Sequence, residues 1–385
     1  MKRAIVLSGG GSKGSYELGV WKALKKLHIS YDIVTGTSIG ALNGALMTQK
    51  SYLRACYIWH KLSLEYLFNQ TPQSEKNVDV FKLFSDNFLK NGGMELEKIE
   101  TIIKKNISPQ KFYKSNIDFG LITYNLSAKK AIQLTKKEIE KEKLVDYLMA
   151  SATCFPAFQM KQIENEKYVD GGIYDNLPIN LALEMGADEL IVVDLKAPGI
   201  KRKVKTDKPM IIIKPKNTIS FFLNFNAQQA KINKQLGYND TMKAFQKLDG
   251  NIFTFKKNEI KNYYQNQKET LNTIFKQNIT EKQFLKMLET LGKTFELKEE
   301  KIYSFRQFKK SLQKQVKNQD ALSKEIKKQI KAMQLQQVKN QKVITLYFLS
   351  RLEKKRKIEK ALTIIFKKSY EQALLLQQLE CHYGK

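Results

Sequence analysis

The sequence predicts an α/β fold with a mostly parallel central sheet, followed by a helical C-terminal extension. Continuous apolar runs at residues 4–7, 31–34, 190–195 and 210–213 are typical of strands that are buried on both faces of a parallel sheet. Segments with helical periodicity follow the first two runs, as they do in strand–helix units. From residue 221 onward the periodicity is helical. We therefore expect an α/β domain over residues 1–250 and a basic helical region over residues 251–385.

Charge is distributed unevenly along the 385 residues. The hydrophobic fraction of 42% is sufficient for a core, and the formal net charge is +29. The first 200 residues hold 26 of the 67 basic residues and 22 of the 38 acidic ones, so almost all of the excess lies in the second half. Such a field attracts nucleic acid or the anionic face of a membrane. The alternative is that the lysines only solvate the surfaces of the helices.

The cysteines predict neither a disulfide framework nor a metal site, because Cys56, Cys154 and Cys381 are odd in number and far apart. A reducing compartment is the simpler interpretation. The first strand leaves no room for a cleavable signal, and the longest apolar stretch, residues 343–349, is far shorter than the roughly 20 residues of a transmembrane helix. We expect a cytoplasmic protein, peripheral on a membrane at most, with no metal or cofactor.

A glycine-rich turn joins the first strand to an amphipathic helix at residues 16–24. Gly9, Gly11 and Gly14 fit the pattern G-x-G-x-x-G. A Walker loop would need a lysine directly after the last glycine, whereas Lys13 precedes it. A dinucleotide site would need an acidic residue at the end of the second strand, whereas Asp32 opens that strand. The remaining interpretation is an oxyanion hole made of backbone N–H groups, which also explains the next motif.

The second strand runs into the pattern G-x-S-x-G, formed by Gly36, Ser38 and Gly40. In a nucleophile elbow the serine occupies a strained turn between strand and helix, and small neighbours let the chain approach closely. The helix that begins there directs its positive dipole end at the reaction centre. Ser38 is therefore a candidate nucleophile.

A carboxylate is the best candidate for the base that would activate Ser38. Triad histidines are usually delivered by loops that follow sheet strands, and none of the three histidines lies in such a place: His28, His60 and His382. Asp170 follows a short strand and precedes Gly171 and Gly172. An Asp-Gly pair is also a common plain turn. A Ser–Asp pair can work if the surroundings tune the pKa of the aspartate.

The segments between these motifs predict further elements. Residues 51–109 are mostly helical and would form a layer or cap near the site, and residues 117–124 and 131–134 would pair as strands. A helix at residues 143–150 precedes Phe155 and Phe158, which either line an acyl pocket or belong only to the core.

Three motifs resemble, in order and spacing, the signatures of patatin-like phospholipases. They are Gly9-Gly10-Gly11-Ser12-Lys13-Gly14, Gly36-Thr37-Ser38-Ile39-Gly40 and Asp170-Gly171-Gly172. The segments SATCFPAF and Asp175-Asn176-Leu177-Pro178 are also similar to that family, so the resemblance covers about residues 3–215. It implies a three-layer α/β sandwich and an acyl hydrolase that acts on lipid esters.

The resemblance also implies roles for individual residues. Ser38 would be the nucleophile and Asp170 the base, with the amides of Gly9, Gly10 and Gly11 as the oxyanion hole. Five glycines would support the motifs: Gly14, Gly36, Gly40, Gly171 and Gly172. The chain has Ser8 where many members carry an acidic residue. Lys13 is a candidate contact for a phospholipid phosphate, and the alternative is a solvated lysine at a helix start.

Beyond residue 250 the sequence carries no motif that we recognise. The segment 237–245 is similar to the final helix of the family's domain. An amphipathic stripe follows, with apolar residues every three or four positions: Phe305, Phe308, Leu312, Val316, Leu322, Ile326, Ile330 and Met333. These helices could pack on the catalytic domain, dimerise, or dock on anionic lipid. An alternative function is therefore an inactive scaffold whose basic half binds an anionic membrane, or nucleic acid, which ranks lower because no aromatic–basic platform is present.

Overall fold

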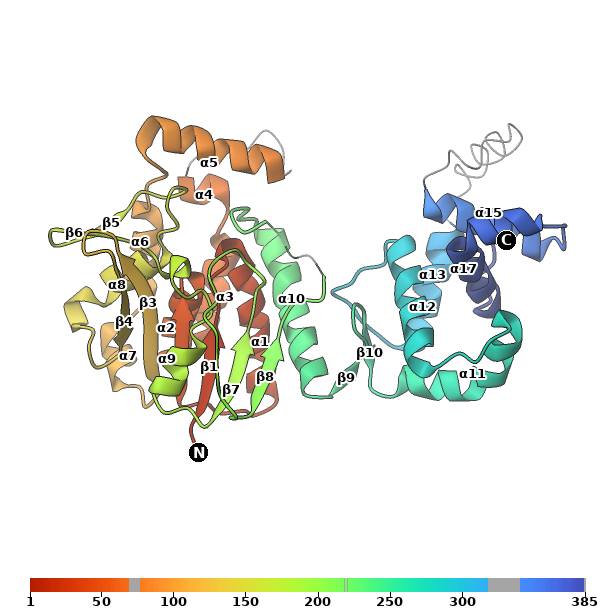
Figure 1. Ribbon diagram of the computed structural model, residues 1–385, viewed down its shortest axis with the longest axis horizontal. Helices are drawn as coiled ribbons and strands as arrows, with labels where there is room; N and C mark the ends of the chain where they lie inside the picture. The colour runs from red at the N-terminus through yellow and green to blue at the C-terminus, as the bar shows by residue number, and fades with distance from the viewer. Residues whose placement is uncertain (69–76, 218, 220, 318–339, 384–385) are drawn as a thin grey trace. The chain divides into compact units, whose positions relative to one another are not determined.

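The computed structural model describes residues 1–68, 77–217, 219, 221–317 and 340–383 (Figure 1). It contains two compact units, Met1–Phe245 and Gln246–Lys385, which are called unit 1 and unit 2 below. In the described part of the chain no helix has both the length and the apolar character needed to cross a membrane.

Unit 1 contains a mixed, mostly parallel sheet, as predicted. Its strands lie in the order β5-β6-β3-β2-β1-β7-β8, with β4 beside β3. The parallel strands are β1 (Arg3–Leu7), β2 (Ile33–Thr37), β3 (Asp118–Asn125), β7 (Glu189–Val193) and β8 (Met210–Ile213). β4 (Lys130–Thr135) and β6 (Glu166–Asp170) run antiparallel to β3, and β5 (Lys161–Ile163), which the sequence analysis missed, pairs with β6.

Both faces of this sheet are covered, which confirms the three-layer arrangement. Ile5 and Leu7 join a large core with the helices of one face, and Ala4 and Val6 join a smaller core with α9 on the other. Alternate residues of β1 are thus buried on opposite sides, as a doubly covered strand requires. The helices of unit 1 are α1 (Ser15–Lys26), α2 (Ile39–Thr48), α3 (Tyr52–Lys61), α4 (Leu64–Phe68), α5 (Asn77–Asn91), α6 (Glu97–Asn106), α7 (Pro109–Lys114), α8 (Leu144–Ala152), α9 (Ile179–Glu184) and α10 (Ala227–Ala244).

The helix α10 completes unit 1 by packing closely against α1. A side chain at Gly19 would overlap the carbonyl of Lys234, and one at Gly237 would overlap the carbonyl of Tyr16. The hydroxyl of Tyr16 also donates a hydrogen bond of 2.7 Å to Asp240. The two glycines therefore let the helix backbones touch. The segment 237–245, which the sequence analysis took for the final helix of the domain, forms the C-terminal part of α10 and its C-cap, Phe245.

Unit 2 has a hydrophobic core of its own, made only of residues between Phe253 and Cys381. Its helices are α11 (Glu259–Phe275), α12 (Glu281–Thr294), α13 (Phe305–Lys317), α15 (Gln341–Glu353), α16 (Lys360–Ile365) and α17 (Lys367–Gln378). The region is helical, as predicted, except for a small sheet of β9 (Leu248–Asp249), β10 (Thr254–Lys256) and β11 (Ile302–Tyr303).

The first half of the predicted amphipathic stripe is buried inside unit 2. Phe308, Leu312 and Val316 of α13 belong to the core of that unit, so these side chains are not a surface for another part of the chain. The second half of the stripe lies outside the described residues: Leu322, Ile326, Ile330 and Met333.

Candidate active site

Ser38 occupies a strained turn between β2 and α2, as the G-x-S-x-G pattern predicts. Its backbone dihedrals are φ 57° and ψ −128°, a region that side-chain-bearing residues rarely adopt. A Cβ on Gly36 would overlap the carbonyl of Gly40, and one on Gly40 would overlap the carbonyl of Leu7. The close packing of the backbone therefore leaves no room for a side chain at either glycine.

A buried serine that the sequence analysis did not single out supports this turn. The N–H of Ser38 donates to the Oγ of Ser151 over 2.9 Å, and the Oγ of Ser151 donates to the carbonyl of Ile122 over 2.7 Å. Ser151 thus ties the elbow to strand β3. Its place in the segment SATCFPAF was the only signal, and a serine at the end of a helix has no distinctive pattern.

Strand register brings Asp170 to Ser38. β4 pairs with β3 from Gly120 to Asn125, so β2 and β6 must share the other edge of β3. β2 ends with Thr37 opposite Ile122, and β6 ends with Asp170 opposite Thr123. The carboxyl ends of two strands that point toward each other therefore meet at adjacent positions of β3.

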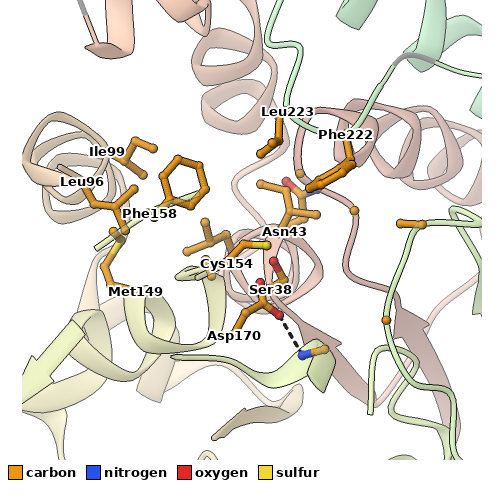
Figure 2. Close-up of a pocket in the computed structure, with 18 of the residues that line it drawn as sticks. Ser38, Asn43, Leu96, Ile99, Met149, Cys154, Phe158, Asp170, Phe222 and Leu223 are labelled. Atoms are coloured by element: carbon orange, nitrogen blue, oxygen red, sulfur yellow. Dashed lines mark hydrogen bonds between the residues drawn. The ribbon is translucent and has the colours of Figure 1, made fainter. Parts of the chain in front are cut away.

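The two side chains lie side by side at the base of a cavity, as Figure 2 shows. The carboxylate of Asp170 lies beside the side chain of Ser38 and accepts a hydrogen bond of 2.7 Å from the N–H of Gly172. Ser38 and Asp170 are only 7% and 8% exposed. Burial raises the pKa of Asp170 to about 6, although the neighbouring side chain of Ser38 and the N–H of Gly172 both favour the charged form.

The glycine-rich turn that follows β1 lies beside this pair. The N–H of Gly9 donates to the carbonyl of Asn176 over 3.1 Å and is therefore already engaged. Gly10 and Gly11 line the cavity, and we find no acceptor for their N–H groups among the described residues. Ile39 also lines the cavity and opens α2, so its N–H has no partner within the helix.

The other predicted site residues lie around this centre. A Cβ on Gly171 would overlap the carbonyl of Ile122, and one on Gly14 would crowd the side chains of Ile39 and Trp59. Lys13 is not among the residues that line the cavity, and its ammonium donates to the carbonyl of Lys196 over 3.3 Å. The described lining also contains no histidine.

The cavity has a volume of about 650 Å³ and a mostly apolar wall. Its apolar residues come from several helices and loops, including Leu42, Leu46, Ile58, Leu62, Leu96, Ile99, Ile103, Met149 and Leu223. Phe155 and Phe158 both line it, so the interpretation that they belong only to the core was wrong. Figure 2 shows Leu96, Ile99 and Phe158 across the cavity from Ser38 and Asp170.

Cys154 also lines the cavity, beside the carboxylate of Asp170. Burial, together with the charge of Asp170, raises the pKa of this thiol to about 12. A thiol with such a pKa stays protonated near neutral pH and is a poor nucleophile.

A second buried acid lies next to the cavity wall. The carboxyl of Glu17 accepts a hydrogen bond of 2.8 Å from Asn43, which lines the cavity and accepts one of 3.0 Å from Trp59. Burial raises the pKa of Glu17 to about 8, so the group is mostly neutral at pH 7. The sequence analysis missed Glu17 because a glutamate in the first turn of a helix is usually solvated.

Comparisons with known proteins agree with the motifs. A family model described as patatin-like phospholipase matches residues 5–183. Lysophospholipase nte1 of Aspergillus terreus is 28% identical over 205 residues, which cover 50% of this chain and 12% of that protein. Patatin-like phospholipase domain-containing protein 6 of Homo sapiens is 28% identical over 197 residues, which cover 50% of this chain and 13% of that protein. The chain thus matches about an eighth of the length of these relatives.

Among solved structures, the chain resembles VipD from Legionella pneumophila with a TM-score of 0.38 and 12% identity, over 99% of this chain and 88% of that one. The family model spans all three motif positions, from the glycine-rich turn to Asp170. Residues 5–183 of the chain therefore match the model of the patatin-like phospholipase family, as the resemblance of the motifs implied.

Proposed function

We propose that the protein is a serine acyl hydrolase that cleaves lipid esters, with Ser38 as nucleophile and Asp170 as base. The observation that carries the proposal is an elbow serine placed beside a buried carboxylate at the base of an apolar cavity. A volume of about 650 Å³ falls within the range of roughly 300–1,000 Å³ for small-molecule sites. An apolar wall suits the acyl chain of a lipid.

In the first half-reaction Asp170 accepts the proton of the Ser38 hydroxyl while Oγ attacks the ester carbonyl carbon. The negative charge that develops on the carbonyl oxygen is stabilised by the N–H groups of Gly10 and Gly11, with the N–H of Ile39 as a third candidate. The N–H of Gly9 donates to Asn176, so the proposed oxyanion hole does not include all three glycines of the motif. Collapse of the intermediate expels the alcohol, which takes the proton from Asp170.

The second half-reaction releases the acyl group from Ser38. Asp170 removes a proton from water as the water attacks the acyl-enzyme, and the proton then returns to Ser38 as the fatty acid leaves. A base with a pKa of about 6 suits both steps, because it is mostly ionised at pH 7 and still more basic than an ordinary aspartate.

The names of the relatives favour lysophospholipids as the first substrates to test. The relative from Aspergillus terreus is named a lysophospholipase. Phosphatidylcholine and lysophosphatidylcholine should therefore be compared directly, with free fatty acid as the product that is measured.

Labelling by a fluorophosphonate and hydrolysis of p-nitrophenyl butyrate test the assignment of the site. Wild type should react in both assays, Ser38→Ala in neither, and Asp170→Asn should lose hydrolysis. Ser30→Ala, at an exposed serine before β2, is the matched control and should behave as wild type. Full activity of Ser38→Ala would refute the assignment.

The basic character of residues 201–385 favours a second candidate, a scaffold without activity that binds an anionic membrane through its helical half. The acyl hydrolase and the scaffold predict different effects of Ser38→Ala in cells. Only the acyl hydrolase loses its cellular effect when Ser38 is replaced by alanine, because that substitution leaves the charges unchanged.

A further inference from the structure

Exposed apolar side chains surround the mouth of the cavity. Leu126, Phe155, Ile173 and Ile200 all line the cavity, and all four are exposed at the surface. The loop that carries Ile200 is fixed over the site, since the N–H of Ile200 donates to the carbonyl of Gly172 over 2.8 Å. A cluster of exposed apolar side chains around a cavity indicates an interaction site.

The helix α5 extends this apolar surface. Val78, Phe81 and Leu89 recur along one face of the helix and are exposed, with 62% of Phe81 and 81% of Leu89 accessible. An adjacent face carries Val80 and Phe84, which are buried in the core of unit 1. The helix is therefore anchored by one apolar face and presents another.

The two apolar surfaces are continuous. The ring of Phe88 on α5 meets the ring of Phe155 edge-on, with 5.6 Å between their centroids. α5 lies at the end of the sheet toward which β1 and β7 point in Figure 1, which is the end that carries Ser38. We call Val78, Phe81, Phe88, Leu89 and the four residues of the mouth the mouth surface.

Basic side chains flank the mouth on two sides. Exposed lysines and an arginine adjoin Leu126 and Ile200: Lys129, Lys130 and Lys167 on one side, and Lys196, Lys201 and Arg202 on the other. The neighbouring acids are Asp194, which pairs with Lys201 at 2.7 Å, and Glu166. The flanks therefore carry a positive excess, and the charges of α5 itself balance, since Asp79 and Asp86 offset Lys82 and Lys90.

We propose that the mouth surface docks on the face of an anionic phospholipid bilayer. The apolar side chains would enter the boundary between headgroups and acyl chains, and the flanking cations would meet the lipid phosphates. Docking there lets an acyl chain pass from the bilayer into the cavity without exposing its apolar surface to water. The proposal rests on the proposed function and places the membrane contact on unit 1 rather than on the basic helices of unit 2.

Vesicle binding tests this directly. Ser38→Ala protein is mixed with vesicles of ether-linked phosphatidylglycerol and phosphatidylcholine, which cannot be hydrolysed, and the bound fraction is measured by sedimentation. Adding Phe81→Ser and Leu89→Ser should weaken binding at least about tenfold, because two large apolar side chains no longer leave water. Adding Lys129→Gln and Lys167→Gln should weaken binding to these vesicles and flatten its salt dependence.

Leu53→Ser is the matched control, since Leu53 is also 81% exposed. It lies at the start of α3, which follows the far end of α2, about 15 Å from the elbow by the length of that helix. Added to Ser38→Ala, the parent protein of these variants, Leu53→Ser should leave vesicle binding unchanged. In the background with Ser38 intact, Phe81→Ser/Leu89→Ser should hydrolyse p-nitrophenyl butyrate at the wild-type rate, which shows that the site is folded.

Three outcomes would overturn the proposal. The first is equal binding by the parent and by Phe81→Ser/Leu89→Ser. The second is a loss of binding only in Lys282→Gln/Lys286→Gln/Lys293→Gln, because these exposed lysines lie on α12 of unit 2. The third is a dimer in solution that Phe81→Ser/Leu89→Ser converts to monomer without a change in vesicle binding. Failure of the proposed function would appear separately, as wild type that binds vesicles but hydrolyses no ester.

Discussion

Replacement of Asp170 by asparagine should abolish activity and at the same time stabilise unit 1. The pKa of Asp170 is about 6 in the folded protein, against an ordinary value of 3.8 for an aspartate in water. The unfolded chain therefore loses this proton at lower pH than the folded chain, so the folded state becomes less stable as pH rises from 3.8 to 6. This pKa difference lowers the free energy of unfolding by about 3 kcal/mol. The loss of stability is complete above pH 6 and absent below pH 3.8.

Asparagine removes that penalty because it stays neutral at every pH. Its Oδ1 can still accept the hydrogen bond that Asp170 accepts from the N–H of Gly172. Asp170→Asn should thus exceed wild type in stability by up to about 3 kcal/mol at pH 7, with little difference at pH 3.5. The proposed base must be ionised to accept a proton, so kcat/KM of wild type for a soluble ester should fall about tenfold per pH unit below pH 6.

Tryptophan fluorescence during urea denaturation can follow unit 1 alone. The chain contains two tryptophans, Trp21 and Trp59, and both lie in unit 1. Unfolding midpoints of wild type and Asp170→Asn are compared at pH 7 and pH 3.5. If the midpoint of Asp170→Asn exceeds that of wild type by the same amount at pH 7 and at pH 3.5, the pKa of the carboxylate is not raised in the folded protein. A pH profile that stays flat between 5 and 7 would refute its role as base.

Three further substitutions test other parts of the site. Ser151→Ala leaves the buried N–H of Ser38 without its acceptor, so unit 1 should lose about 1–3 kcal/mol of stability and kcat should fall at least about tenfold. Glu17→Gln should stabilise unit 1 by about 3 kcal/mol at pH 7 but not below pH 4.5, because the pKa of Glu17 is raised to about 8. Ile99→Trp should shorten the cavity, so the ratio of kcat/KM for p-nitrophenyl palmitate over butyrate should fall at least about tenfold.

Most strands of the sheet could be predicted from the sequence because their local patterns agree with their burial. The expectation that residues 210–213 form a strand buried on both faces was wrong: β8 forms, but Ile211 and Ile212 are exposed, because β8 is the last strand at its edge of the sheet. β1, β2 and β7 are continuous apolar or small-residue runs, and all but their first residues are buried on both faces. β5 was missed because three residues with one buried side chain carry no periodicity. β9 and β11 were missed for the same reason, since each is only two residues long.

The candidate site was predictable only as a set of residue types. Gly36 and Gly40 identify the elbow because they make room for the turn within their own short motif, where a Cβ on Gly36 would overlap Gly40. Ser151, Glu17 and the acceptor of the Gly9 amide were not predictable, because each depends on contacts between residues far apart in sequence. The N–H of Gly9, for example, meets the carbonyl of Asn176, which lies 167 residues away.

The meeting of Ser38 with Asp170 depends on a feature of β3 that no local pattern encodes. One edge of this strand pairs with β2 along its first half and with β6 along its second half, so that two strands of opposite direction end against each other. A shift of β6 by one residue would turn the side chain of Asp170 to the other face of the sheet. The hydrogen bond from Thr123 Oγ1 to the carbonyl of Val169, 2.9 Å long and buried, fixes the pairing at this position. The chemistry proposed for the site therefore depends on the register of a strand as much as on the two side chains that the motifs supply.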